Sequence, residues 1–161
     1  MIPVNMRQKR NPAELAAPAN GTGQYQDTRV DVKFVLSGLW VAMLFVFAYV
    51  DIFAFFRADV LGAALEGTVA NTPLAVNQVF LTTALLFILP ATLMVVLSLV
   101  LKPRVNRVLN ISVSLLYAVI ITALCIGETW VYYLLGSAVE VVLLLAIART
   151  AWKWPRREVT S

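Results

Sequence analysis

The sequence predicts an all-α fold, a bundle of four transmembrane helices with both chain ends in the cytoplasm. Its 161 residues are 60% hydrophobic and 14% charged, whereas soluble domains contain about 45–50% apolar and about 25% charged residues. The apolar residues gather in four segments of about 20 or more residues, enough to cross a hydrocarbon core of about 30 Å. A buried soluble bundle is disfavoured because soluble helices keep a polar face. The predicted spans are residues 34–56, 74–101, 108–127 and 129–148.

The four spans and their connections form one transmembrane domain, residues 31–155. Residues 1–30 are polar and contain Pro, Gly, Asn and Gln, a composition that predicts a disordered cytoplasmic tail. This segment has no apolar core of the kind that a signal peptide requires. Residues 156–161 form a second, short cytoplasmic tail.

Prolines mark two features of the second span and its connections. Pro90, inside the span, removes a backbone donor and kinks the helix, either for packing or as a hinge that shapes a cavity. Residues 102–107, KPRVNR, are predicted to form a tight cytoplasmic hairpin in which Pro103 ends the second helix. The loop before the span, residues 57–73, is compatible with a short interfacial helix and equally with a plain loop.

The basic residues predict the orientation of the chain. Twelve of the thirteen Lys and Arg residues lie before the first span, between the second and third, or after the fourth, and only Arg57 lies on the other side. The positive-inside rule places the basic side in the cytoplasm. We therefore expect a multi-pass protein of the bacterial inner membrane, anchored at the inner interface by Trp152 and Trp154. Basic residues that flank spans in this way do not indicate a nucleic-acid partner.

Several chemistries are excluded by residue usage. The chain has no histidine, which removes most haem, zinc and copper sites. Its single cysteine, Cys125, cannot supply the cysteine pair of a thiol–disulfide enzyme. No P-loop or other Gly-rich phosphate cradle is present. We predict no metal, no cofactor and no catalytic residue.

Polar side chains inside the spans are the candidates for function. A charge at the bilayer centre costs roughly 2.5–3.5 kcal/mol on insertion scales, and intramembrane carboxylates usually face the bundle or a wet cavity. Asp51 and Glu140 lie in such positions with no basic residue beside them in the sequence. The predicted intramembrane polar site comprises Asp51, Asn77, Gln78, Tyr117, Tyr132, Tyr133 and Glu140.

The two carboxyl groups are predicted to lie at different depths. At 1.5 Å of rise per residue from the outer boundary, Asp51 lies roughly 9 Å deep and Glu140 roughly 18 Å. We expect Asp51 to share an outward-facing pocket with the amides that open the second span and the tyrosines of the fourth. A water or a hydroxyl would have to connect Asp51 with Glu140. Alternatively, a protonated Glu140 bonded to Tyr117 would only join two helices, a contact that contributes about 0.6 kcal/mol on average.

Helical spacing predicts which side chains share an inward face, because residues three and four apart lie on one side of a helix. Gly136 falls between two polar members of such a stripe and would let a backbone or a ligand come close. The stripes are Ser37, Trp40, Leu44, Phe47 and Asp51; Asn110, Ser114, Tyr117 and Ile121; and Tyr133, Gly136 and Glu140.

Three segments carry a resemblance to a known family: LSGLWVAMLFVFAYVDIF (36–53), LSLVLKPRVNRVLNI (97–111) and GETWVYYLLGSAVEVVLLLAIARTAWKWP (127–155). Their motifs are the W…Y-x-D of the first span, the LKP-x-x-NR hairpin and the Trp-x-Trp-Pro end. The chain resembles a family of small four-helix bacterial integral membrane proteins described as a domain of unknown function. It is similar more loosely, by architecture, to DoxX-like four-helix proteins. The resemblance implies fold and topology and implies no activity.

Three classes of function remain. The first is a binding or accessory subunit, in which membrane lipid, a quinone or other apolar ligand, a second copy, or a partner membrane protein uses a polar-lined cavity. The alternative is a small proton-coupled transporter, acting as a dimer through Glu140 or Asp51. It resembles the small multidrug exporters in size and in its membrane carboxylate, but their key acid lies at mid-depth in the first helix. A membrane enzyme ranks last because no nucleophile–base pair supports it.

Overall fold

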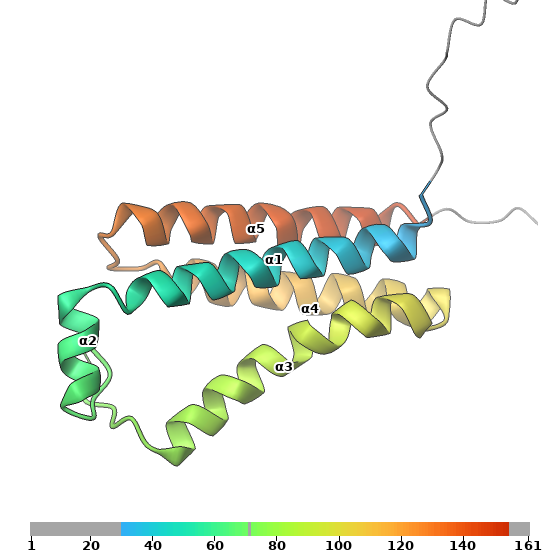
Figure 1. The fold of residues 1–161 in the computed structure, drawn as a ribbon. Helices are drawn as coiled ribbons and strands as arrows, with labels where there is room; N and C mark the ends of the chain where they lie inside the picture. Colours follow the sequence, from blue (N-terminus) through green and yellow to red (C-terminus); the bar gives the residue numbers. More distant parts are fainter. Residues whose placement is uncertain (1–29, 71, 155–161) are drawn as a thin grey trace, which may run out of the picture.

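A computed structural model describes residues 30–70 and 72–154 of the chain (Figure 1). The predicted cytoplasmic tails lie almost wholly outside these residues. The all-α prediction is confirmed, and four of the helices are long and apolar enough to cross a membrane. The helices are α1 Val32–Ala54, α2 Ala58–Leu65, α3 Gln78–Val100, α4 Pro103–Leu124 and α5 Val131–Trp152.

The four long helices form a bundle with two distinct ends (Figure 1). The hairpin end holds the start of α1, the α3–α4 connection and the end of α5. The α2 end holds α2, the loop that leads to α3, and the α4–α5 connection. Both described ends of the chain therefore lie at the hairpin end, as expected for an even number of spans.

The short connections follow from local residue chemistry. Residues 58–65 form a helix, so the structure resolves the choice that the sequence left open between a helix and a plain loop. Gly67 follows this helix with a φ of 75°, the left-handed conformation that commonly ends helices. Pro103 is the first residue of α4, where its missing N–H costs nothing and its fixed φ favours a helix start. The hairpin is consequently only two residues long, because α3 ends at Val100.

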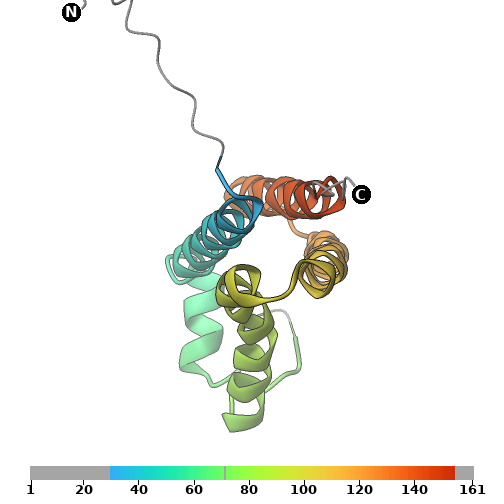
Figure 2. The same cartoon turned by 90° about the vertical axis from the view of Figure 1, so that its right-hand side faces the viewer.

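Helix α3 packs against the bundle along only part of its length. Its buried residues are Ala91, Met94 and Ser98, all beyond Pro90. Figures 1 and 2 show the preceding half of the helix diverging from the other spans toward the α2 end. Pro90 has no N–H to donate to the carbonyl one turn earlier, and its ring bends a helix at that point. The predicted kink therefore separates a packed half of α3 from a half that faces outward.

The core is built from the inward faces of α1, α4 and α5 together with the packed second half of α3. On α4 the predicted stripe is confirmed, since Asn110, Ser114, Tyr117 and Ile121 are all buried. On α1 the buried face is rotated from the prediction. It runs through Leu36, Trp40, Met43 and Val50, so Trp40 is shared with the predicted stripe whereas Asp51 is exposed.

Candidate functional site: a groove between α1 and α5 and the polar residues around it

An open groove of about 420 Å³ separates α1 from α5 in the half of the bundle near the α2 end. Binding sites for small molecules typically have volumes of about 300–1,000 Å³. From Phe45 to Phe53 the groove follows nine residues of α1, a rise of about 12 Å at 1.5 Å per residue. Its walls are almost entirely apolar. The lining residues are Phe45, Val46, Tyr49, Val50, Phe53, Tyr132, Leu135, Gly136 and Val139.

Gly136 brings the two helices together at the floor of this groove. A Cβ atom at this position would overlap Cγ2 of Val50, with nothing else as close. The close approach that the sequence predicted at Gly136 is thus an approach of the Val50 side chain of α1. Val50 occupies this contact and is buried, whereas the next residue, Asp51, is exposed.

Tyr132 supplies a polar group at the α2 end of the groove. Its hydroxyl oxygen is buried and makes no hydrogen bond of ordinary geometry among the described residues, although it lies close enough to the Arg57 guanidinium to help raise the pKa of that group. The ring lies in edge contact with Phe53 of α1, at 6.4 Å between centroids, and with Trp130, at 6.1 Å. A buried tyrosine hydroxyl usually finds a partner, so this donor is available to a bound molecule or to water.

Glu140 is the second buried polar group without a partner. Its side chain lies one turn beyond Gly136 on α5 and the residue is only 2% exposed. Its Oε1 atom is buried and has no hydrogen-bond partner in the described part of the chain. Unsatisfied buried groups in native proteins are uncommon and often indicate a water, an ion or a functional role.

The structure places Asp51 near Glu140 but in a different environment. Asp51 is exposed, near the end of α1. Asp51 and Glu140 lie close enough to interact electrostatically, and both interact with the half-buried Tyr133. These three residues therefore belong to one electrostatic neighbourhood. The water or hydroxyl link between the two carboxyl groups stays a prediction.

The two amides predicted for this site have a local role. Asn77 is the N-cap of α3, and its side-chain oxygen accepts a hydrogen bond of 3.0 Å from the backbone N–H of Phe80. Both Asn77 and Gln78 are exposed. They lie at the start of α3, where that helix is furthest from the bundle (Figures 1 and 2).

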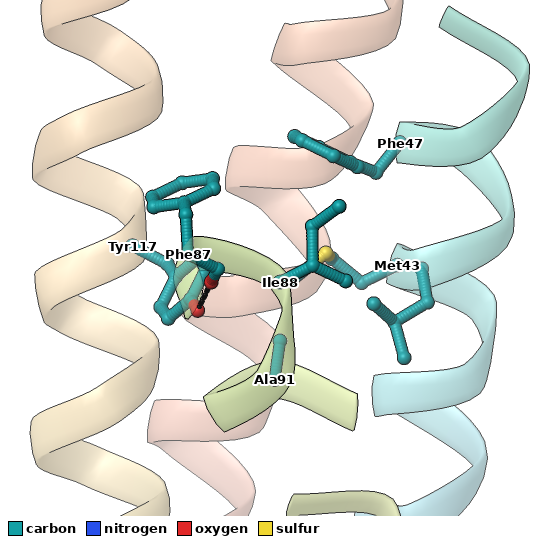
Figure 3. A pocket seen from close by; sticks show the side chains of 7 residues that line it. Met43, Phe47, Phe87, Ile88, Ala91 and Tyr117 are labelled. Atoms are coloured by element: carbon teal, nitrogen blue, oxygen red, sulfur yellow. Dashed lines mark hydrogen bonds between the residues drawn. The ribbon is translucent and has the colours of Figure 1, made fainter. Parts of the chain in front are cut away.

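Tyr117 joins α4 to α3. Its hydroxyl donates a hydrogen bond to the carbonyl of Phe87, as Figure 3 shows, and its ring lies 5.0 Å from that of Phe87. The hydroxyl therefore has an acceptor other than Glu140. An apolar cavity beside the two rings, bounded by Met43 and Phe47 of α1, holds only about 10 Å³. A water needs at least this volume together with polar partners, so this cavity is a packing defect and not a ligand site.

A polar network that the sequence did not predict lies at the hairpin end. Asn110 Oδ1 accepts hydrogen bonds from Trp40 Nε1 at 2.8 Å and from Ser98 Oγ at 3.2 Å. Asn110 Nδ2 donates to the side-chain and backbone oxygens of Asn106, at 2.7 and 2.9 Å. Asn106 Nδ2 in turn donates to the Ser98 carbonyl at 2.6 Å. All four side chains are fully buried, so α1, α3 and α4 are joined by an amide centre inside the bundle.

The sequence did contain a signal for this network. Asn106 and Asn110 are four residues apart and therefore share a helix face, and Ser98 lies one turn before the hairpin. A hairpin over residues 102–107 would place Asn106 in a loop, whereas α4 already begins at Pro103 and Asn106 is helical. The predicted stripe consequently included Asn110 and omitted Asn106.

Charged residues connect the loops at the α2 end. Arg57 bonds Asp59 through two nitrogens, at 3.2 and 2.7 Å, and bonds Glu128 at 3.2 Å. Its guanidinium also lies 4.5 Å above the ring of Trp130. The hydrogen bond from Arg57 holds the pKa of Asp59 below its ordinary value. The pKa of Glu128 is also lowered, first by the backbone N–H of Trp130 and then by that of Thr129 and by Arg57. Both carboxylates are therefore charged at neutral pH.

Metal chemistry finds no support in the described residues, which contain no cluster of three His, Cys, Asp or Glu side chains that could hold an ion.

The chain matches a family described as a family of unknown function, DUF6326, over residues 25–161, and it belongs to this family. This finding agrees with the resemblance that the sequence motifs indicated. Comparisons with curated proteins and with solved structures gave no match. With its four apolar helices, the chain is a multi-pass integral membrane protein of a family without an assigned activity.

Proposed function

We propose that this protein is a binding or accessory membrane protein that holds an apolar molecule within the bilayer, in the groove between α1 and α5. The hairpin end faces the cytoplasm and the α2 end faces outward, in the orientation that the positive-inside rule favours. One observation carries the proposal. The two buried polar atoms without partners in the described part of the chain, Tyr132 Oη and Glu140 Oε1, lie on or next to the α5 wall of this groove.

The chemistry of the groove favours binding over catalysis. A ligand pocket needs a mostly apolar wall and a few polar groups that orient the molecule. The α1–α5 groove has both, in its aromatic and aliphatic lining and in the hydroxyl of Tyr132. Glu140 lies behind the groove, on the same turn of α5 as Val139, and can receive a polar group or a water that accompanies the ligand.

A photoreactive apolar probe tests the proposal. The full chain in lipid vesicles is labelled with a diazirine fatty acid, and the labelled residues are located by mass spectrometry. We expect labelling along α1 and α5 that excess unlabelled fatty acid suppresses. Labelling of the exposed face of α3 around Val96 should not be suppressed, because this residue lines neither the α1–α5 groove nor the hollow of about 690 Å³ between α4 and α5. Labelling that excess unlabelled fatty acid suppresses on neither face would contradict the proposal.

A matched pair of substitutions controls for nonspecific effects. Leu135→Trp covers the groove and Val96→Trp does not, although the two side chains are similarly exposed, at 65% and 58%. The saturable labelling should be lost in the first variant and kept in the second.

The second candidate function is a proton-coupled transporter that acts as a dimer through Glu140 or Asp51. The observation that favours it is the electrostatic proximity of one buried and one exposed carboxyl group, since chains of intramembrane carboxyls mark proton paths in transporters. In this case Glu140→Gln should abolish proton movement into proteoliposomes under an imposed gradient of a transported compound, with folding intact. Proton flux that is unchanged in this variant would refute the transporter.

A further inference from the structure

We propose that the α1–α5 groove binds one acyl chain of a phospholipid whose headgroup carries an ammonium group, with that headgroup against the acidic cluster at the α2 end. The proposal rests on the binding function above and names the class of ligand. Three independent features of the described residues support it: the length of the groove, a free hydroxyl donor at its mouth, and the sign of the charge beyond the mouth.

The groove has the length of a lipid chain in one leaflet. It follows α1 for about 12 Å, while half of a hydrocarbon core of about 30 Å is about 15 Å. The groove runs from the α2 end toward the bilayer centre, ending at Phe45 and Val139. Its open side faces away from the bundle axis, so a lipid can enter laterally. A chain that lies here contacts Val50 and Gly136 at the floor and the rings of Tyr49 and Phe53 at the sides.

The hydroxyl of Tyr132 lies where a lipid changes from apolar to polar. Tyr132 is the second residue of α5, two residues after Trp130, and tyrosines and tryptophans gather at the level of the headgroups. The ester carbonyls of a phospholipid lie at the same boundary and accept hydrogen bonds. A chain in the groove would therefore bring its ester carbonyl to a buried hydroxyl whose proton has no acceptor among the described residues, beside the Arg57 guanidinium.

The charge beyond the mouth selects the headgroup. The loops at the α2 end, residues 55–77 and 125–130, contain three acidic residues and a single basic one, Arg57. Arg57 is already paired with Asp59 and Glu128, so it is not free to bind a phosphate. The Asp59 side chain remains 40% exposed and can accept hydrogen bonds from an ammonium group. Acidic headgroups would be repelled by the excess negative charge.

Lipid retention tests the proposal. The full chain is reconstituted in vesicles of equal parts phosphatidylethanolamine and phosphatidylglycerol, extracted in mild detergent, and examined by native mass spectrometry. We expect one retained lipid per chain, with phosphatidylethanolamine about fivefold preferred, the ratio expected for one charge near a membrane surface. Asp59→Asn should reduce this preference. Tyr132→Phe should weaken retention of either lipid by roughly threefold to tenfold, the effect of one lost hydrogen bond.

Two substitutions separate this proposal from the broader binding function. Leu135→Trp should abolish retention and Val96→Trp, outside the groove, should preserve it. Retention that disappears in Leu135→Trp but shows no preference, or favours phosphatidylglycerol, would overturn the ammonium lipid and leave apolar binding standing. Finding a molecule without an amine in the groove, or a second copy of the chain in place of lipid there, would likewise overturn the ammonium lipid. Equal retention in both tryptophan variants would overturn both proposals.

Discussion

The hairpin end of the bundle and the half near the α2 end solve the burial of polar groups in opposite ways. At the hairpin end the amides of Asn106 and Asn110 are fully buried, and they are bonded to one another and to Trp40 and Ser98. In the other half α3 diverges, and a carboxyl and a hydroxyl on α5 are buried without described partners. A satisfied network joins helices and leaves nothing to bind, whereas unsatisfied groups beside a groove are available to a ligand.

The contrast is physical as well as geometric. Inside a membrane the alternative to a protein partner is hydrocarbon, so an unpaired polar group is costly. The hairpin end removes that cost within the chain itself. Near the α2 end, Glu140 and Tyr132 depend on water, lipid or another bound molecule. We therefore assign stability to the first region and binding to the second, and the following predictions test this division in order of decreasing effect on stability.

Removing the amide of Asn110 should have the largest effect. Asn110→Ala leaves the buried indole N–H of Trp40 and the side chain of Asn106 without their partner, at a cost of about 1–3 kcal/mol for each group left unsatisfied. We expect a loss of about 2–4 kcal/mol in the free energy of unfolding, on the upper side of what membrane hydrogen bonds contribute. Unfolding in mixed micelles with increasing dodecyl sulfate measures it. Thr92→Ala, on the exposed face of α3, is the control and should change little; equal effects would refute the role of the network.

Gly136→Ala should destabilise the contact between α1 and α5. The added methyl overlaps Val50, and overpacking of this kind costs about 1–3 kcal/mol. The same assay should show a recovery in the double variant with Val50→Ala, which removes the overlapping atom. Gly38→Ala is the matched control, because a Cβ there meets nothing within 4 Å. If the two glycine variants behave alike, the close approach at Gly136 is not what limits the packing.

Pro90→Ala should bring the two halves of α3 closer to one line. The substitution restores a backbone donor for the carbonyl of Leu86 and removes the ring clash, with a gain of about 0.5–1.5 kcal/mol for one hydrogen bond. Spin labels at Leu81 and Phe53 report the distance between α3 and α1 at the α2 end by pulsed electron resonance. We expect this distance to change, while a pair at Val100 and Phe34 at the hairpin end stays constant. A change at the hairpin end alone would contradict a hinge at Pro90.

The ionic cluster at the α2 end should give a small effect confined to acid pH. The pKa of Glu128 is lowered from its ordinary value of 4.5, so its stabilisation is complete above that pH and is lost as the pH falls through the lower folded-state pKa. The pair with Arg57 is partly exposed, which limits its contribution to about 0.2–1 kcal/mol. Melting temperatures between pH 3 and pH 7 should fall with acidity in the wild type and vary less in Glu128→Gln. Identical profiles would show that the cluster does not contribute.

Much of the fold was predictable because membrane insertion imposes a strong pattern on sequence. Four long apolar segments, the proline at the hairpin and the proline within the second span each have a local physical meaning, and the structure contains a helix, a turn or a bend at each. The inward stripe of α4 was also predictable, since Asn110, Ser114 and Tyr117 recur every three or four residues along one face of the helix. The burial of Asn106 was not predicted, because the hairpin is shorter than the sequence indicated and Asn106 lies in α4.

The candidate site was less predictable from the sequence. The rotation of α1 depends on the fit of Val50 over Gly136, a contact between helices that are far apart in the chain. This rotation buries Val50 and exposes Asp51, although both residues fit an inward stripe by spacing. The divergence of α3 likewise separates Asn77 and Gln78 from the other spans. Depth along a helix follows from counting residues, but the direction of a side chain around the helix requires knowledge of its neighbours.

The sequence by itself determined that this protein is a membrane-spanning helical bundle, because hydrophobic length and charge are properties of the chain that need no partner. Only the tertiary structure decided which polar groups are satisfied. Asn110 and Glu140 are both buried polar residues in the middle of apolar helices, yet one is surrounded by donors and acceptors and the other is not. That difference arises from the packing of α1, α3 and α5 around each of them, and it is what directs attention to the groove between α1 and α5.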